Sequence, residues 1–164
     1  MNVDRILETL NNEHVDYLLI GGMNFLLRHF PELTFDVDIW VQDSSKNLDD
    51  LNRALRDLGA EWGLREQDWK PVEPSSDRLT RQAVFCLTTR FGALDVFRKV
   101  AGLECGFEVC KERYYSAHTA VGVPYLGLSD EDMLRCQMAI PLGLRKQRRI
   151  QILEAALSRR RSGL

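Results

Sequence analysis

Residues 34–41 have the sequence TFDVDIWV, and this stretch decides the fold. Alternate side chains of a strand share a face, so apolar residues line one face while Asp36 and Asp38 stand side by side on the other. Two adjacent carboxylates repel each other and raise the pKa of one unless a cation intervenes, and their oxygens suit Mg²⁺ or Mn²⁺. A solvated edge strand would explain the acids more simply. The apolar residues Phe35, Trp40 and Val41 favour a central strand instead.

A glycine pair precedes this strand. Residues 17–22, YLLIGG, predict a buried strand that ends at Gly21 and Gly22, followed by a helix that Pro31 terminates. Glycine lets the backbone approach a ligand closely, and the first turn of the helix offers free N–H groups to a phosphate. A tight turn that needs positive φ would explain the same pair without a ligand.

A third acidic residue, Asp95, lies within the apolar sequence GALDVF of residues 92–97. Residues 82–88 and 93–96 are strand-like, and the intervening Gly92 favours a hairpin between them. A buried carboxylate must be paired or coordinate a ligand. The simple alternative is a salt bridge to Arg98 or Lys99, whereas a strand adjacent to residues 34–41 would bring three carboxylates together.

The rest of the chain predicts a mixed α/β domain. Apolar residues at helical spacing predict four further helices, at about residues 3–12, 45–58, 129–138 and 144–158, and residues 121–125 predict a last short strand. Residues 62–77 predict a mobile loop, in which Trp62 or Trp69 either stacks on a substrate or anchors the core. We expect one domain over residues 1–164, with a core at about 1–126 and a C-terminal helical pair at about 127–164.

Composition excludes several classes of protein. The chain has 164 residues, is 45% hydrophobic and 28% charged, and contains no apolar stretch near the roughly 20 residues that a membrane helix needs. The four cysteines and three histidines are scattered without zinc-site spacing. The N-terminus lacks the form of a signal peptide. We therefore expect a cytoplasmic protein with free thiols and no membrane partner.

The glycine pair, the paired acids of residues 34–41 and the later Asp95 occur in an order that resembles the minimal nucleotidyltransferases of the DNA polymerase β-like superfamily. The resemblance covers about residues 17–100. Within the superfamily, the sequence is most similar in character to small proteins related to AbiEii-type toxins. It implies the nucleotidyltransferase fold, an α/β (α+β) domain in which helices flank a small mixed sheet.

The same resemblance implies roles for individual residues. Gly21, Gly22 and Thr34 would contact a nucleoside triphosphate such as ATP. Asp36 and Asp38 would bind two Mg²⁺ (or Mn²⁺) ions, while Asp95 would complete one metal site and help to activate an acceptor hydroxyl. The acceptor could be the end of a tRNA or another RNA, a protein side chain or a small molecule such as an antibiotic. The resemblance does not settle the oligomeric state.

The C-terminal region departs from these relatives. Residues 141–164 carry a net charge of +6, so the other 140 residues carry −8. Residues 145–149, RKQRR, are basic where the relatives have acidic positions. Helical spacing places Arg145 and Arg149 on the stripe of Ile152, so we expect both arginines to face the nucleotide site. A solvated basic helix is the alternative.

Three functions fit this sequence. The presence of all three acids favours a metal-dependent nucleotidyltransferase. A catalytically silent nucleotide-binding or antitoxin-like regulatory module would have the same fold. A plain nucleic-acid-binding domain rests on the basic tail alone.

Overall fold

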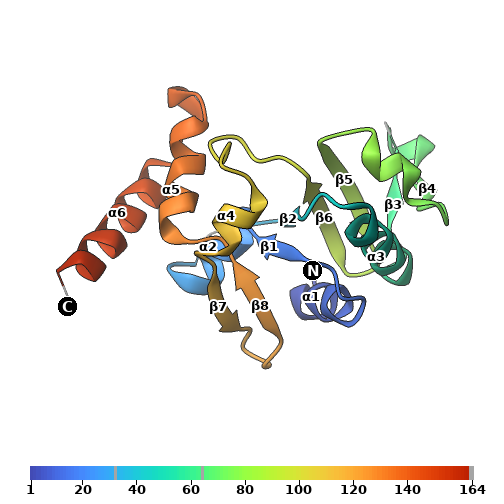
Figure 1. Cartoon of the computed structure of the whole chain (residues 1–164), viewed down its shortest axis with the longest axis horizontal. Helices are drawn as coiled ribbons and strands as arrows, with labels where there is room; N and C mark the ends of the chain where they lie inside the picture. The colour runs from blue at the N-terminus through green and yellow to red at the C-terminus, as the bar shows by residue number, and fades with distance from the viewer. Residues whose placement is uncertain (32, 64, 163–164) are drawn as a thin grey trace.

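The computed structural model describes residues 1–31, 33–63 and 65–162 (Figure 1). In chain order, the helices are α1 (Val3–Asn12), α2 (Gly21–Arg28), α3 (Ser45–Asp57), α4 (Phe107–Lys111), α5 (Asp130–Ala139) and α6 (Gln147–Arg161). The strands are β1 (Tyr17–Leu19), β2 (Asp36–Val41), β3 (Glu61–Trp62), β4 (Lys70–Pro71), β5 (Val84–Thr89), β6 (Gly92–Phe97), β7 (Tyr115–His118) and β8 (Pro124–Gly127). Short 3₁₀ turns occupy Glu66–Asp68, Ser76–Thr80 and Leu142–Leu144.

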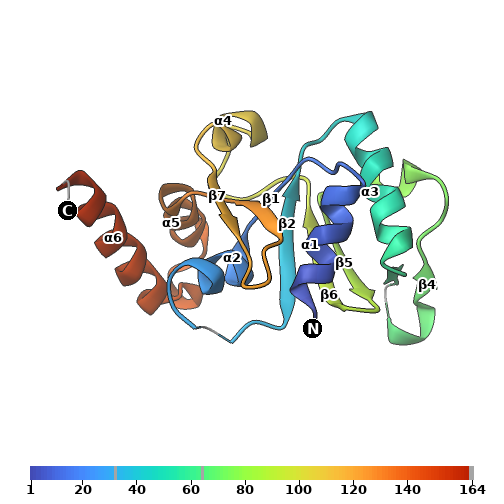
Figure 2. The ribbon, with the colours of Figure 1, turned by 90° about the horizontal axis from the view of Figure 1, so that it is seen from below.

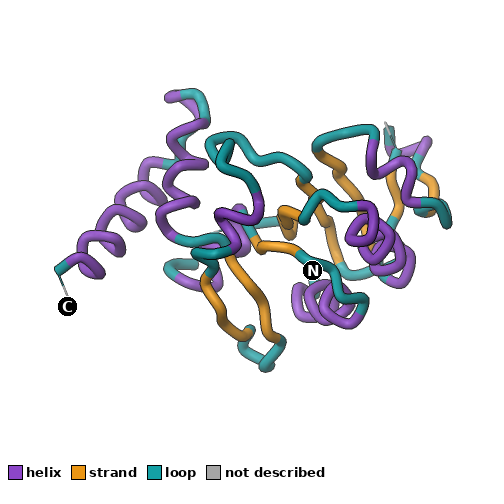
Figure 3. Tube along the Cα trace, viewed as in Figure 1, coloured by secondary structure: helices purple, strands orange, loops and turns teal. Residues whose placement is uncertain are grey.

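All eight strands belong to one mixed sheet of order β4-β3-β5-β6-β2-β1-β8-β7. Strand β2 lies near its middle, antiparallel to β1 and parallel to β6. The tube in Figure 3 shows these strands running through the centre of the molecule, with helices on either side. The acidic stretch therefore forms a central strand, as the sequence predicts, and the α/β class is confirmed.

Each face of β2 packs against a different apolar cluster. Val37 and Ile39 are fully buried beneath α1 and α3, where Leu10 and Leu51 belong to the same cluster. Figure 2 shows these two helices lying together along one side of the sheet. Trp40 faces the opposite side, and its ring contacts Phe107 edge to face at 5.3 Å. Because side chains alternate along β2, those of Asp36, Asp38 and Trp40 face the other side of the sheet, where α5 and α6 lie.

Two serine caps begin their helices where the sequence predicts. The Ser44 hydroxyl accepts a hydrogen bond from the Asn47 N–H at the start of α3. The Ser129 hydroxyl accepts one of 3.1 Å from the Asp132 N–H at the start of α5. Each cap satisfies an N–H that has no partner within the helix. Helix α3 ends before Gly59, whose φ of +61° suits glycine.

The predicted loop at residues 62–77 is wrong in part. Strand β3 ends at its first residue, strand β4 lies within it, and Trp62 is only 3% exposed. Its ring lies 5.7 Å from that of Phe85, and its indole N–H donates to Glu73. Trp62 is therefore a core anchor, because sheet pairing of residues 61–62 turns its side chain inward. Trp69 remains half-buried.

Two other boundaries differ from expectation. The single strand expected at residues 121–125 is the second strand of the antiparallel hairpin β7–β8, displaced towards Gly127. The last helix begins at Gln147 instead of residue 144, because Pro141 opens a 3₁₀ turn and Arg145 has an extended backbone. None of the helices in the described residues is both long and apolar enough to cross a bilayer.

Candidate active site

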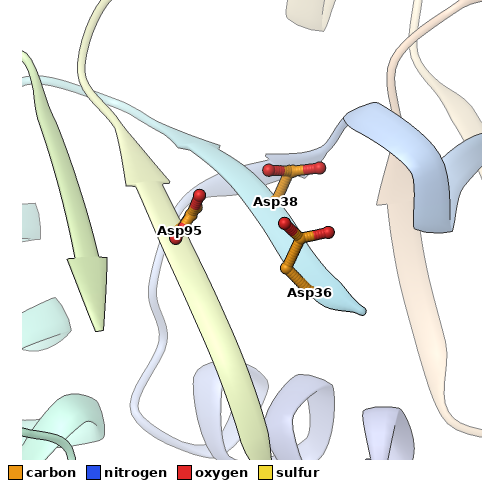
Figure 4. A group of neighbouring side chains, drawn as sticks. All are labelled: Asp36, Asp38 and Asp95. Carbon is orange, nitrogen blue, oxygen red and sulfur yellow. The ribbon is translucent and has the colours of Figure 1, made fainter. Parts of the chain in front are cut away.

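Three carboxylates meet where β2 and β6 lie side by side. The parallel register pairs Asp38 directly with Asp95, and Asp36 precedes Asp38 by one full pleat on the same face. One oxygen from each of the three acids lies within 4.8 Å of the others. Figure 4 shows all three side chains on the same side of the two strands. Asp95 does not pair with Arg98, which instead binds Asp43 at 2.8 Å.

The crowding of these acids changes their pKa values. Burial, followed by the charges of Asp36 and Asp95, raises the pKa of Asp38 from its ordinary value of 3.8 to about 6. A hydrogen bond from the Gly22 N–H and the charge of Arg149 oppose this shift. Burial also raises the pKa of Asp95, against a hydrogen bond from Cys86 and with a further contribution from Asp36. A bound cation would relieve this repulsion.

The glycine pair packs against this site. Gly21 begins α2 with φ of +64°, and a Cβ there would overlap the Asp38 carboxylate. A Cβ on Gly22 would lie 2.7 Å from the Thr34 hydroxyl oxygen. That hydroxyl in turn donates to Asp36 Oδ1 at 3.1 Å. The need for glycine therefore comes from the acids and Thr34, and the N-terminus of α2 opens directly beside them.

A cleft of about 340 Å³ extends from the acids towards the C-terminal helices. Its lining includes the glycine pair, Thr34, Asp36 and Asp38 on one side, and Gln137, Lys146 and Arg149 on the other. Arg149 is 7% exposed, so its charge faces Asp38 from a largely desolvated position. The cleft therefore extends from an acidic site that suits metal ions to a basic wall that suits phosphate.

A buried ion-pair cluster fixes the walls of this cleft. Asp130, at the start of α5, is 1% exposed and accepts hydrogen bonds from Arg28 and His29 at the end of α2. Arg160 of α6 approaches the same carboxylate at 3.4 Å. Because removing one partner of a buried pair is costly, the cluster holds α2, α5 and α6 in fixed relation.

Arg145 does not reach the cleft. Its guanidinium donates to the carbonyl oxygens of Ile140 and Met138, at 2.8 and 2.7 Å, and so ties down the turn between α5 and α6. Its expected position assumed a helix from residue 144, whereas α6 begins at Gln147, two residues after Arg145. Arg149, by contrast, lines the cleft as expected.

Three residues near the site were not predicted. Lys146 and Gln137 line the cleft, and only the basic run at 145–149 hinted at the lysine. Cys86 lies opposite Asp95 on β5, with its exposed thiol beside that carboxylate. The hairpin expected over residues 82–96 could have placed it there, because cross-strand partners share a face.

No protein-family model matches the sequence, and no curated protein matches it either. Among solved structures, the fold is similar to that of the lincosamide antibiotic adenylyltransferase LnuA bound to lincomycin. The TM-score is 0.59 at 16% sequence identity, over 91% of this chain and 92% of that one. It is also similar to the antibiotic-resistance factor ANT(2'')-Ia, with a TM-score of 0.51 at 13% identity, over 98% and 91% of the two chains. The chain has the nucleotidyltransferase fold.

Proposed function

We propose that this chain is a metal-dependent nucleotidyltransferase that transfers a nucleoside monophosphate from a triphosphate to an acceptor hydroxyl and releases pyrophosphate. The observation that carries the proposal is the meeting of Asp36, Asp38 and Asp95, with one oxygen of each within 4.8 Å of the others. Two of these acids, Asp36 and Asp38, line a cleft whose far wall is basic. Such a cleft fits a ligand that presents metal ions and phosphates together. The similarity of the fold to that of the adenylyltransferase LnuA supports the same class of reaction.

The three acids fit Mg²⁺ or Mn²⁺ as the cofactor. Their donors are hard carboxylate oxygens, which these ions prefer, and one oxygen from each acid lies within 4.8 Å of the others. When bound, the cations would neutralise charge that develops on the phosphate oxygens in the transition state. Asp36 and Asp38 would hold them, and Asp95 would complete one of the two sites.

The chain's own residues supply positioning and electrostatics. The N–H groups at the start of α2, beginning with Gly21 and Gly22, would bind phosphate oxygens. Arg149 and Lys146 would bind the triphosphate from the opposite wall of the cleft. Asp95, which lies beside Asp38 across the paired strands, would accept the proton of the attacking hydroxyl. Thr34 would keep Asp36 oriented through their hydrogen bond.

We propose a small-molecule hydroxyl as the first acceptor class to test, because LnuA acts on a lincosamide antibiotic. An RNA end or a protein side chain is the second class, by the motif resemblance to AbiEii-type toxin relatives. In that case expression of the chain would slow growth of its host. Either reaction would use cytoplasmic triphosphates. A silent, antitoxin-like module of the same fold would bind the triphosphate without transferring it.

One experiment separates these hypotheses. The protein is incubated with each labelled nucleoside triphosphate, Mg²⁺ and a cell extract divided into small-molecule, RNA and protein fractions. Label that enters one fraction identifies the acceptor class. Asp38→Asn should abolish labelling, whereas Asp43→Asn, which removes the same charge far from the site, should not. Binding of triphosphate without any labelling would favour the silent module, and the absence of Mg²⁺-dependent binding would refute both.

A further inference from the structure

A second cleft, of about 410 Å³, lies on the other side of the basic wall. It opens between the segment that joins α2 to β2 and the first turns of α6, which lie close together in Figure 2. Phe25, Phe30 and Leu33 line it from the N-terminal half of the chain, and Arg148 and Ile152 from α6. Most of this lining is apolar, and no residue of the acidic triad belongs to it.

The cleft combines flat rings with flat cations. The guanidinium of Arg148 lies over the ring of Phe30, 4.1 Å from its centroid, and that of Arg149 lies 5.1 Å from the centroid of Phe25. Phe30 is 40% exposed and Leu33 77% exposed, so large apolar surface faces water at the mouth. Rings and guanidinium planes arranged in this way bind planar heteroaromatic groups by stacking.

The two clefts adjoin each other, because they share two lining residues. Lys146 and Arg149 line both of them, with the acids and the α2 N-terminus on one side and the Phe30–Arg148 pair on the other. A ligand that fills both must carry phosphates at one end and a flat, uncharged ring at the other. A nucleoside triphosphate has this form. We infer that the nucleobase of the donor triphosphate occupies the second cleft, stacked on the Phe30–Arg148 pair.

This inference rests on the proposed function and adds the site that binds the nucleobase. A base from a single-stranded acceptor has the same chemistry, but the geometry favours the donor. Asp95, which would face the acceptor hydroxyl, is not among the described residues that line the first cleft, of about 340 Å³. It lies instead beside the exposed Cys86 on β5. An acceptor hydroxyl at Asp95 would therefore lie on the β5 side of the acids, next to Cys86.

The test compares ligands with and without a base. Isothermal titration calorimetry with Mg²⁺ measures the binding of tripolyphosphate and of the common nucleoside triphosphate that wild type binds most tightly. Phe30→Ala removes the ring, and Arg148→Lys keeps the charge while removing the flat guanidinium. Phe35→Ala is the matched control, because this phenylalanine is 75% exposed next to β2 and lines neither cleft within the described residues. Circular dichroism checks that each variant is folded.

We expect Phe30→Ala to weaken binding of the triphosphate by roughly 5- to 150-fold, the range for loss of one base–aromatic stack. Arg148→Lys should weaken it less, and neither change should alter binding of tripolyphosphate. Phe35→Ala should alter neither ligand. Triphosphate affinity unchanged in both variants would overturn the inference and leave the proposed function intact. A titration with a single-stranded oligonucleotide tests the alternative, and variants that lose affinity for this ligand alone would also overturn the inference. If wild type binds neither phosphate ligand, the proposed function fails, and the inference with it.

Discussion

Replacing Asp38 with asparagine should stabilise the protein in the absence of metal. The charges of Asp36 and Asp95, together with burial, raise the pKa of Asp38 to about 6. In the unfolded chain it returns to about 3.8, so between these values the folded state holds the extra proton. Stability from this group therefore falls as pH rises from about 4 to 6 and stays low above that. Asp38→Asn removes the charge that causes the loss.

The expected size follows from the pKa shift. About two units at 1.36 kcal/mol each set an upper limit of about 3 kcal/mol for the gain in unfolding free energy at pH 8. Partial exposure of the carboxylate lowers this, and about 1–2 kcal/mol is the value we expect. The asparagine oxygen can still accept the hydrogen bond from Gly22. At pH 4 the aspartate is almost fully protonated in the folded state and roughly 40% protonated in the unfolded chain, so the stabilisation of the variant should shrink to about 0.5 kcal/mol or less.

Urea denaturation followed by circular dichroism at pH 4, 6 and 8, in EDTA and in Mg²⁺, measures this effect. In Mg²⁺ wild type should gain stability by mass action while Asp38→Asn should not. Asp43→Asn serves as the control, because it removes the same charge from a pair with Arg98 and should lose at most about 1 kcal/mol. If Asp38→Asn in EDTA at pH 8 is no more stable than wild type, the repulsion argument is wrong.

Three further predictions follow from the geometry. Gly21→Ala should lower the free energy of unfolding by about 1–2 kcal/mol, because Gly21 lies in the left-handed backbone region. The added Cβ should also displace Asp38 and abolish Mg²⁺-dependent triphosphate binding in calorimetry, and normal binding would contradict this. Arg149→Ala should weaken triphosphate binding by about tenfold or more, as expected for a hydrogen bond to a charged group. Arg145→Ala should leave that affinity nearly unchanged, and equal losses would place both residues in the site. Ser129→Ala should lower the free energy of unfolding by about 0.5–2 kcal/mol through loss of the helix cap, without altering nucleotide binding.

Local patterns in the sequence predicted most of the elements around the site. The alternation at residues 34–41 follows from side-chain direction within a strand, which is a local property. The hairpin around Gly92 likewise follows from two adjacent strand-like segments and the glycine between them. Adjacent placement of Asp38 and Asp95 needed one further assumption, that β6 pairs with β2, and the register bears it out. The strand at residues 61–62 was missed because two residues give no periodicity, and its pairing with β5 is a long-range contact.

The C-terminal helices show where such reasoning ends. Spacing on an assumed helix placed Arg145 beside Arg149, yet the hydrogen bonds of Arg145 to Met138 and Ile140 hold it in the preceding turn. The sequence predicted no role for Arg148, which lies over Phe30, a residue more than a hundred positions earlier in the chain. No local pattern encodes that contact, because it depends on how α2 and α6 pack.

The sequence by itself determined the central acidic strand, the glycine turn and the identity of the three carboxylates, because each is set by residue type and short-range periodicity. Only the tertiary structure decided which cations face those carboxylates and that a second, aromatic cleft adjoins them. The physical reason is distance along the chain: the walls of both clefts come from segments that meet only when α5 and α6 dock against α2. The buried carboxylate of Asp130 joins these helices through ion pairs with Arg28 and Arg160.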